Sequence, residues 1–142
     1  MSNLAELGTM PEILRIEKEI LAMPQVECPL IHYHIDGVYA RRGFIPAGTV
    51  LTGAIHKFES ISILAQGTLR ITNGNTSHVI SAPHVMTDKP GIKRLGYAET
   101  DCTFITIHKT DTKDEGDIRD KLICDTFEDY EKHEQQLLLG DK

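Results

Sequence analysis

The sequence predicts an all-β domain, a sheet rolled into a small barrel, with one helix before it and one after it. Between Ile31 and His108, short β-branched and aromatic runs alternate with glycine, proline and asparagine, a pattern typical of closely spaced antiparallel strands. The 142 residues suffice for one hydrophobic core but are few for two. We therefore interpret residues 1–142 as one domain, with a helical segment at 1–30, the barrel at 31–109, and an acidic linker and helix at 110–142.

Residues 9–12 predict the start of the first helix. Thr9 and Glu12 have the spacing of a capping box, and Pro11 lies in the first turn, where its missing N–H is tolerated. Apolar residues then recur every three to four positions, at Ile13, Leu14, Ile16, Ile20 and Leu21. We expect an amphipathic helix from Pro11 to Met23, ended by Pro24.

The central region contains six runs with the composition of strands. They are Val38–Arg41, Thr49–Thr52, Ser60–Leu64, Thr68–Ile71, His78–Ile80 and Thr103–Ile107. The segments between them hold residues that favour tight turns, at 46–48, 66–67, 73–75 and 89–91. Strands this short and closely spaced favour a barrel or a sandwich over a sheet of alternating strands and helices.

The region after His108 begins with an acidic, polar stretch at residues 111–117, which we interpret as a linker. Apolar residues then return at helical spacing, at Ile118, Leu122, Ile123, Phe127 and Tyr130. We expect a C-terminal helix whose apolar stripe packs against the barrel or against a dimer partner.

The composition is that of a soluble globular protein, with 40% hydrophobic and 25% charged residues. The apolar runs are too short to span a bilayer, and residues 1–6 lack the basic start and apolar stretch of a secretory signal. Cys28, Cys102 and Cys124 are odd in number and scattered, which fits reduced thiols rather than a disulfide framework. We expect a cytoplasmic protein that does not contact a membrane.

The charge of the chain opposes binding to nucleic acid. The formal net charge is −6, whereas binding to a phosphate backbone needs a basic face. Two short basic clusters, at Arg41–Arg42 and at Lys89 to Arg94, are interpreted mainly as solvated surface. We therefore expect no nucleic-acid partner.

One spaced motif carries the strongest signal. Gly48, Ala54, His56, Ser60 and Gly67 resemble the first cupin motif, G-x5-H-x-H-x3-E-x6-G, with Ala54 replacing its first His and Ser60 its Glu. The stretch 39–57 is also similar to the opening of small cupins from phage and bacterial genomes. The resemblance covers about residues 37–109 and implies a double-stranded β-helix, or jelly-roll barrel, with a ligand pocket inside.

The departures from the family pattern place a family-type metal centre in doubt. The second cupin motif, P-x-G-x2-H-x3-N, is met only approximately, with Arg94 in the place of its His and Ala98 in the place of its Asn. Cupin metal sites usually combine three His and one Glu, of which only His56 remains in register. A divalent transition metal would instead need His56, His108 and Glu59, with a bulge turning Glu59 inward.

A metal-free pocket is the other interpretation of the same residues. An inward Arg94 would offer two parallel hydrogen bonds to a carboxylate or phosphate, with Ser60 and Ser62 as polar neighbours. His56 would exchange a proton near neutral pH, as in cupins resembling the sugar-nucleotide epimerases. His32 and His34 alternate along the chain and could share a face at the mouth of the pocket.

Three hypotheses about function follow. The first is a small-molecule-binding cupin that holds an anionic, phosphorylated or nucleotide-like ligand through His56, Ser60, Ser62 and Arg94. The second is an enzyme, either metal-dependent or a metal-free isomerase with His56 as the catalytic general base. The third is a non-catalytic interaction module. Cupins commonly pair, so we expect a homodimer in each case.

Overall fold

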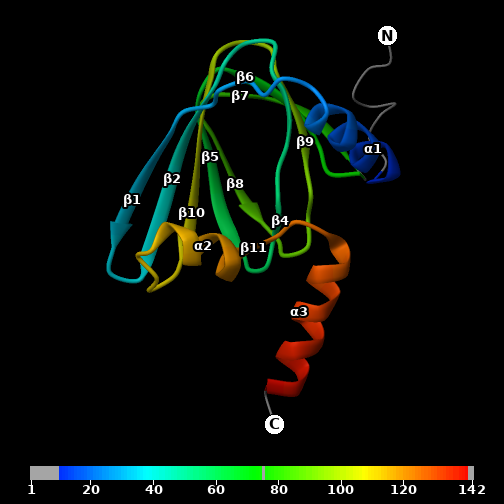
Figure 1. The fold of residues 1–142 in the computed structure, drawn as a ribbon. Helices are drawn as coiled ribbons and strands as arrows, with labels where there is room; N and C mark the ends of the chain where they lie inside the picture. The colour runs from blue at the N-terminus through cyan, green and yellow to red at the C-terminus, as the bar shows by residue number, and fades with distance from the viewer. Residues whose placement is uncertain (1–9, 75, 141–142) are drawn as a thin grey trace.

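The computed structural model describes residues 10–74 and 76–140 of the chain (Figure 1). Helix α1 spans Met10–Leu21, which confirms the first predicted helix. Its proposed cap at Thr9, the expectation for residues 1–6, and Asn75 of the predicted 73–75 turn lie outside the described residues. None of the described helices is long and apolar enough to cross a membrane.

Two antiparallel sheets form the body of the molecule. The larger sheet has the strand order β1 (Leu30–Ile35), β2 (Val38–Ile45), β10 (Cys102–Lys109), β5 (Ser60–Gln66) and β8 (His84–Asp88). The smaller sheet has the order β3 (Val50–Thr52), β9 (Leu95–Ala98), β6 (Thr68–Thr72) and β7 (Ser77–Ser81). Along the chain the strands pass repeatedly from one sheet to the other, as in a jelly roll.

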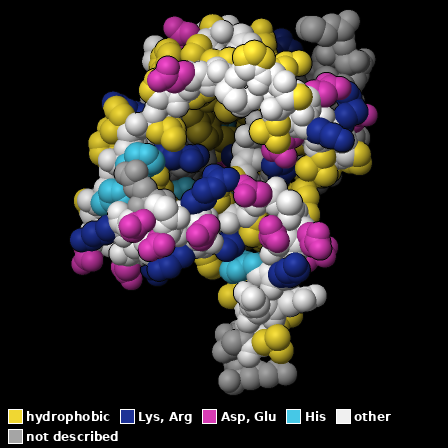
Figure 2. Space-filling model, viewed as in Figure 1, with side chains coloured by type: hydrophobic (Ala, Val, Ile, Leu, Met, Phe, Trp, Pro, Cys, Tyr) yellow, Lys and Arg dark blue, Asp and Glu magenta, His cyan; other side chains and the backbone are white. Residues whose placement is uncertain are grey.

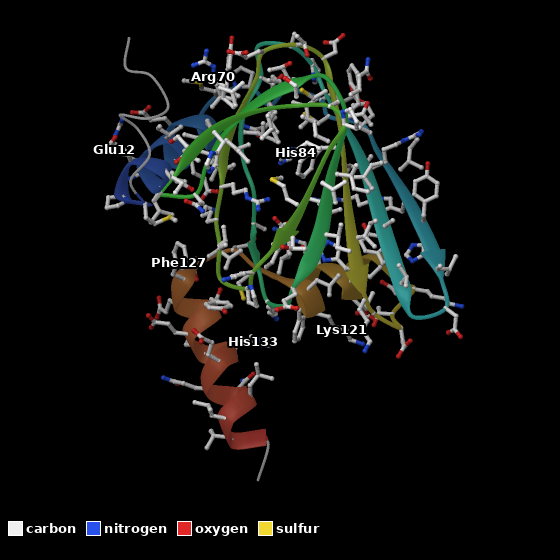
Figure 3. The ribbon with its side chains drawn as sticks, turned by 180° about the vertical axis from the view of Figure 1, so that it is seen from behind. Glu12, Arg70, His84, Lys121, Phe127 and His133 are labelled. Atoms are coloured by element: carbon white, nitrogen blue, oxygen red, sulfur yellow. The ribbon has the colours of Figure 1, made fainter. Side chains whose placement is uncertain are left out.

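The C-terminal region closes one end of this body. Helix α2 (Glu115–Leu122) is followed by strand β11 (Ile123–Cys124), which pairs with β4 (Ile55–His56), and then by helix α3 (Phe127–Gly140). The carboxylate of Asp114 caps α2 by accepting hydrogen bonds from two backbone N–H groups. Helix α3 projects away from the sheets (Figures 1 and 3).

Several elements differ from the expected ones. We expected one C-terminal helix, but the pairing of β11 with β4 divides it into two, and α2 begins inside the predicted 111–117 linker. Strands β8 and β9 were not predicted, because His-Val-Met-Thr-Asp and Leu-Gly-Tyr-Ala have little intrinsic strand preference. Pairing with β5 and β6 overrides that preference.

The main hydrophobic core lies between the two sheets, away from α2. It consists of Ile45, Leu64, Leu69, Ile71, Ile80, Ala98 and Cys102. A smaller cluster, in which Tyr39 packs against Ile118 and Leu122, attaches α2 to the larger sheet. The two clusters therefore sit at opposite ends of the space between the sheets.

The turn between β5 and β6 requires glycine. Gly67 has a φ of +92°, and a Cβ atom there would lie 2.2 Å from the backbone oxygen of Asp101. Only a residue without a side chain fits both the backbone conformation and this approach. The last glycine of the cupin-like motif thus lets the chain cross from the larger to the smaller sheet.

Helix α1 is held to the barrel by a buried ion pair. Lys93 is 2% exposed, and its Nζ lies 2.6 Å from Glu17 Oε2 and donates a hydrogen bond to the Gly53 carbonyl. Thr52 Oγ1 donates to the same oxygen of Glu17 at 2.6 Å. Because Lys93 is neutralised and bonded in this way, its burial is tolerated.

Candidate ligand pocket

The strand register places side chains, most of them polar, in two rows on the inner face of the larger sheet. One row contains His34, Tyr39, His108, Ser60 and Asp88, and the next contains His32, Arg41, Thr106, Ser62 and Met86. Alternate residues of a strand face the same side, so strands in register bring these side chains to one surface. The predicted site residues Ser60 and Ser62 belong to these rows.

The rows form the polar part of a cavity of about 1240 Å³ between the two sheets. Its polar lining includes His32, Tyr39, Arg41, His56, Ser62, Asp88, Arg94, Thr106 and His108. Figure 2 shows the hollow from its open side, with hydrophobic side chains deep inside and Lys and Arg side chains along its lower edge. The described part of the barrel is therefore hollow rather than filled.

His56 is positioned by the short ladder between β4 and β11. It pairs with Ile123 in that ladder, and its carbonyl accepts a hydrogen bond of 2.9 Å from Gly91 N. Its ring lies against His108, with the ring centroids 5.3 Å apart. The structure thus places His56 in the pocket, next to His108, one of the two residues predicted to join it in a metal site.

Asp88 connects the predicted residues to one another, although the sequence did not single it out. It is 3% exposed and accepts hydrogen bonds from the hydroxyls of Ser60 and Ser62 and from the guanidinium of Arg94. The inward interpretation of Arg94 is consistent with this contact, since Arg94 forms an ion pair inside the pocket rather than extending into solvent. Asp88 directly precedes the Lys89–Gly91 turn, and an aspartate at such a position is usually interpreted as a turn residue. Only the alternation of residues along β8 could have indicated that Asp88 is buried.

His56 is linked to Asp88 through Ser60. His56 Nδ1 lies 3.1 Å from Ser60 Oγ, which lies 3.4 Å from Asp88 Oδ2. An ionised carboxylate only accepts, so the Ser60 hydroxyl donates to Asp88 and accepts from the Nδ1–H of His56. This assignment leaves Nε2 of His56 without a proton and able to accept one.

Burial keeps both pocket histidines neutral. The pKa of His56 is lowered mainly by burial, and further by Arg94 and Arg41, while Asp88 acts in the opposite direction. The pKa of His108 is lowered to about 4 by burial and by the neighbouring His56 and Arg41. At neutral pH the positive charge that acts on these histidines therefore comes from Arg41 and Arg94.

Arg41 is a pocket residue that the sequence reasoning missed. We interpreted Arg41–Arg42 as solvated surface, which fits Arg42, but Arg41 shares the inward face of β2 with Tyr39 and lines the cavity. Within the described residues the structure gives Arg41 no hydrogen bond and no ion pair. The hydroxyl of its buried neighbour Thr106 also has no hydrogen-bond partner there. Alternation along the strand was the signal that could have identified Arg41.

The predicted metal ligands do not come together. His56 and His108 are adjacent, but Glu59 is exposed, because β5 pairs regularly with β8 and turns Ser60 and Ser62 inward instead. The bulge lies elsewhere, between Thr103 and Phe104 of β10. Across residues 10–74 and 76–140, no three His, Cys, Asp or Glu side chains are grouped to hold a metal ion. These donors do not fit a metal centre.

The histidines of β1 lie at the edge of the polar rows. His32 Nδ1 is 2.7 Å from the Tyr39 hydroxyl, and the rings of His34 and Tyr39 have centroids 5.2 Å apart. His32 lines the cavity, whereas His34 is not among its lining residues. The aromatic ring of Tyr39 therefore joins both β1 histidines to His108, whose ring centroid is 6.0 Å away.

The solved structures with a similar fold include proteins of the cupin superfamily. A cupin superfamily protein from Desulfitobacterium hafniense superimposes with a TM-score of 0.52 at 11% identity, over 63% of this chain and 83% of that chain. The chain has the cupin fold. The predicted fold class, a cupin jelly roll with an N-terminal and a C-terminal helix, is confirmed.

Other cupin-like matches have similarly low identity. A putative ethanolamine utilization protein Q from Salmonella typhimurium gives a TM-score of 0.51 at 12% identity, over 60% of this chain and 71% of that one. An acetylacetone dioxygenase from Acinetobacter johnsonii gives a TM-score of 0.50 at 15% identity, over 61% of this chain and 66% of that chain. No protein-family model and no curated protein matches the sequence. The comparisons therefore establish the cupin fold, and the site must be interpreted from its own residues.

Proposed function

We propose that this cupin binds a small anionic molecule, a carboxylate or a phosphate, in the polar part of its cavity. The observation that carries the proposal is Arg41, a half-buried guanidinium that faces the cavity and has no carboxylate partner among the described residues. A guanidinium in such a place is suited to an oxyanion, because its parallel N–H groups match the two oxygens of the anion.

The charges around Arg41 favour an anion as well. Arg41 and Arg94 contribute two positive charges, Asp88 contributes one negative charge, and the neutral His56 and His108 contribute none. The charged groups that act on these histidines, Arg41, Arg94 and Asp88, thus sum to one positive charge, within a chain whose net charge is −6. Asp88 holds Arg94 through Nη2 and leaves Arg41 as the guanidinium available for a ligand.

Neutral polar groups complete the proposed site. Thr106 presents a buried hydroxyl that has no hydrogen-bond partner in the described structure. The ligand would accept a hydrogen bond from this hydroxyl and thereby satisfy a polar group whose burial otherwise costs free energy. The open cavity also favours a binding protein over an interaction module, for which a filled interior would be expected.

Titration calorimetry with inorganic phosphate and with acetate tests the proposal. At least one of the two anions is expected to bind, and Arg41→Gln is expected to weaken binding about tenfold or more, because it removes a charge-assisted hydrogen-bond pair. Arg42→Gln is the matched control, since Arg42 is exposed on the opposite face of the same strand. Absence of binding by both anions, or equal affinity of wild type and Arg41→Gln, would refute the proposal.

A second function, proton transfer by His56, is favoured by the hydrogen bonds that connect His56 through Ser60 to Asp88. These hydrogen bonds orient a neutral imidazole whose Nε2 is free to accept a proton, as a general base requires. The test is NMR in D₂O with 2-oxobutyrate, which combines a carboxylate with an acidic C–H next to a carbonyl. We expect exchange of that proton with wild type and loss of exchange with His56→Gln, with binding retained. Equal exchange rates for the two proteins would exclude His56 as the base.

A further inference from the structure

The cavity changes from polar to apolar along its length. Its far wall is formed by Ile45, Leu69 and Ile71, which are 6%, 4% and 8% exposed. Leu51 and Phe104 pack against this group and also line the cavity. These residues come from both sheets, so a molecule in this part of the cavity would be enclosed by hydrocarbon on two sides.

The polar and apolar parts share the same strands. On β2 the inward positions run from Tyr39 and Arg41 to Ile45, and on β10 they run from His108 and Thr106 to Phe104. Ile45 lies four positions after Arg41 on the same strand, which corresponds to a distance of about 13 Å along the strand. A ligand bound to Arg41 that extends along the cavity therefore leaves the polar rows and enters the apolar end.

The entrance near α1 is apolar too. Leu21, Met23 and Val26 line the cavity, yet they are 71%, 60% and 56% exposed. Large apolar side chains grouped at the mouth of a cavity are a feature of sites that accept apolar molecules. The end of α1 and the chain that follows it thus continue the apolar lining outward.

We infer that the ligand of this pocket is amphipathic: an organic acid whose anionic head binds Arg41 and whose aliphatic or aromatic body lies against Ile45, Leu69 and Ile71. The inference rests on the proposed function and narrows its ligand class. It disfavours a nucleotide with several charged groups, because polar atoms placed against this wall would lose their hydrogen bonds to water without replacement.

Titration calorimetry with a series of straight-chain carboxylates, from acetate through butyrate and hexanoate to octanoate below its micelle concentration, tests the inference. Each buried methylene is expected to tighten binding about three- to fourfold, which corresponds to about 0.8 kcal/mol. The gain in affinity should stop once the hydrocarbon chain of the carboxylate is longer than the apolar end of the cavity.

Two variants locate the apolar contact. Leu51→Gln is expected to weaken octanoate binding about tenfold and to leave acetate binding unchanged, because Leu51 contacts only the hydrocarbon part. Leu21→Ser, at a position that is 71% exposed, carries little risk of unfolding and is expected to weaken octanoate binding about threefold. Leu138→Ser is its control, since Leu138 is similarly exposed at 73% but lies on α3.

The outcomes separate the inference from the proposed function. Acetate and octanoate of equal affinity, both weakened by Arg41→Gln, would overturn the amphipathic ligand and leave anion binding intact. Octanoate binding that is unchanged in Arg41→Gln would overturn the head-group assignment. An unchanged preference for long chains in both Leu51→Gln and Leu21→Ser would also overturn the inference.

Discussion

At the scale of single residues, Asp88 organises the polar end of the pocket. Its carboxylate is almost completely buried and is bonded to Arg94 and to two serine hydroxyls. A buried carboxylate is tolerated only with such partners, and an arginine beside it needs the carboxylate in return. Removal of the negative charge should therefore affect both stability and the neighbouring histidines.

We expect Asp88→Asn to lower the free energy of unfolding by about 2–3 kcal/mol, because Arg94 loses its counter-charge. The pKa of His56 and that of His108 should fall further, since Asp88 acts to raise both. Urea denaturation and NMR titration of the imidazole protons measure the two effects. Asp120→Asn, on the exposed surface of α2, is the control, and an equal loss of stability in both variants would contradict the role of Asp88.

The pocket histidines also predict how stability depends on pH. An imidazole in the unfolded chain has a pKa near 6.5, whereas burial lowers that of His108 to about 4 in the folded chain. Between these values the unfolded chain binds more protons, so stability is complete above about pH 6.5 and decreases as the pH falls towards 4. The contribution of His108 is on the order of 2 kcal/mol.

Chemical denaturation at pH 7 and pH 5 checks this dependence. Between pH 7 and pH 5, His108→Gln should lose less free energy of unfolding than wild type does. The variant lacks the imidazole whose pKa is lower in the folded chain than in the unfolded chain. His78→Gln is the control, because His78 is exposed. If all three proteins lose the same stability, His108 does not contribute.

The sequence allowed part of the site to be predicted. The motif spacing identified His56, Ser60 and Arg94, and Ser62 was expected as a polar neighbour. The structure places these residues around Asp88. Arg41 and Asp88 were missed because their environment depends on which strands become neighbours, and the spacing of one motif does not contain that information. Glu59 was misplaced for the same reason, since regular pairing of β5 with β8 left no bulge to turn it inward.

At the scale of elements, the pocket depends on how short segments are held in place. Strand β4 has two residues, and its pairing with β11 attaches His56 to the C-terminal region. The helices at both ends and six of the strands could be predicted from periodicity and composition. Strands β1, β4, β8, β9 and β11 were not among the predicted runs. Their structure depends on pairing with neighbouring strands.

The turn at Gly67, where the chain crosses from the larger to the smaller sheet, allows a prediction about stability. Gly67→Ala is expected to lower the free energy of unfolding by about 2–4 kcal/mol, because alanine disfavours the positive φ and its Cβ would collide with the backbone at Asp101. Gly53→Ala is the control, since a Cβ there meets no atom within 4 Å. Thermal or urea denaturation measures the difference, and equal stability of the two variants would refute it.

At the scale of the whole molecule, the outer face of the larger sheet is apolar and exposed. Ile31, Tyr33, Ile61 and Val85 are 44%, 46%, 42% and 64% exposed, and the register places them in two neighbouring rows. Arg42 lies between them on the same face. An exposed face with several large apolar side chains is a feature of surfaces that contact another molecule.

The homodimer remains a prediction from the sequence, and we expect this face to be its interface. Light scattering after size exclusion should give twice the mass of the chain, and Ile61→Lys should shift it to the mass of a monomer, because a buried lysine would lack a partner. Val79→Lys is the control, since Val79 is 57% exposed on β7 of the other sheet. A monomeric wild type would show that this face is not a dimer interface.

The alternation of strands between the two sheets has a consequence for folding. Strands β2 and β10 are neighbours although about 60 residues separate them, and the pairs of β5 with β8 and of β6 with β9 also join parts of the chain that are not consecutive. Loop closure must precede such contacts, so the chain should fold in milliseconds to seconds rather than in microseconds. The cavity would form only when the last strand enters the larger sheet, and no N-terminal fragment that ends before β10 should bind a ligand.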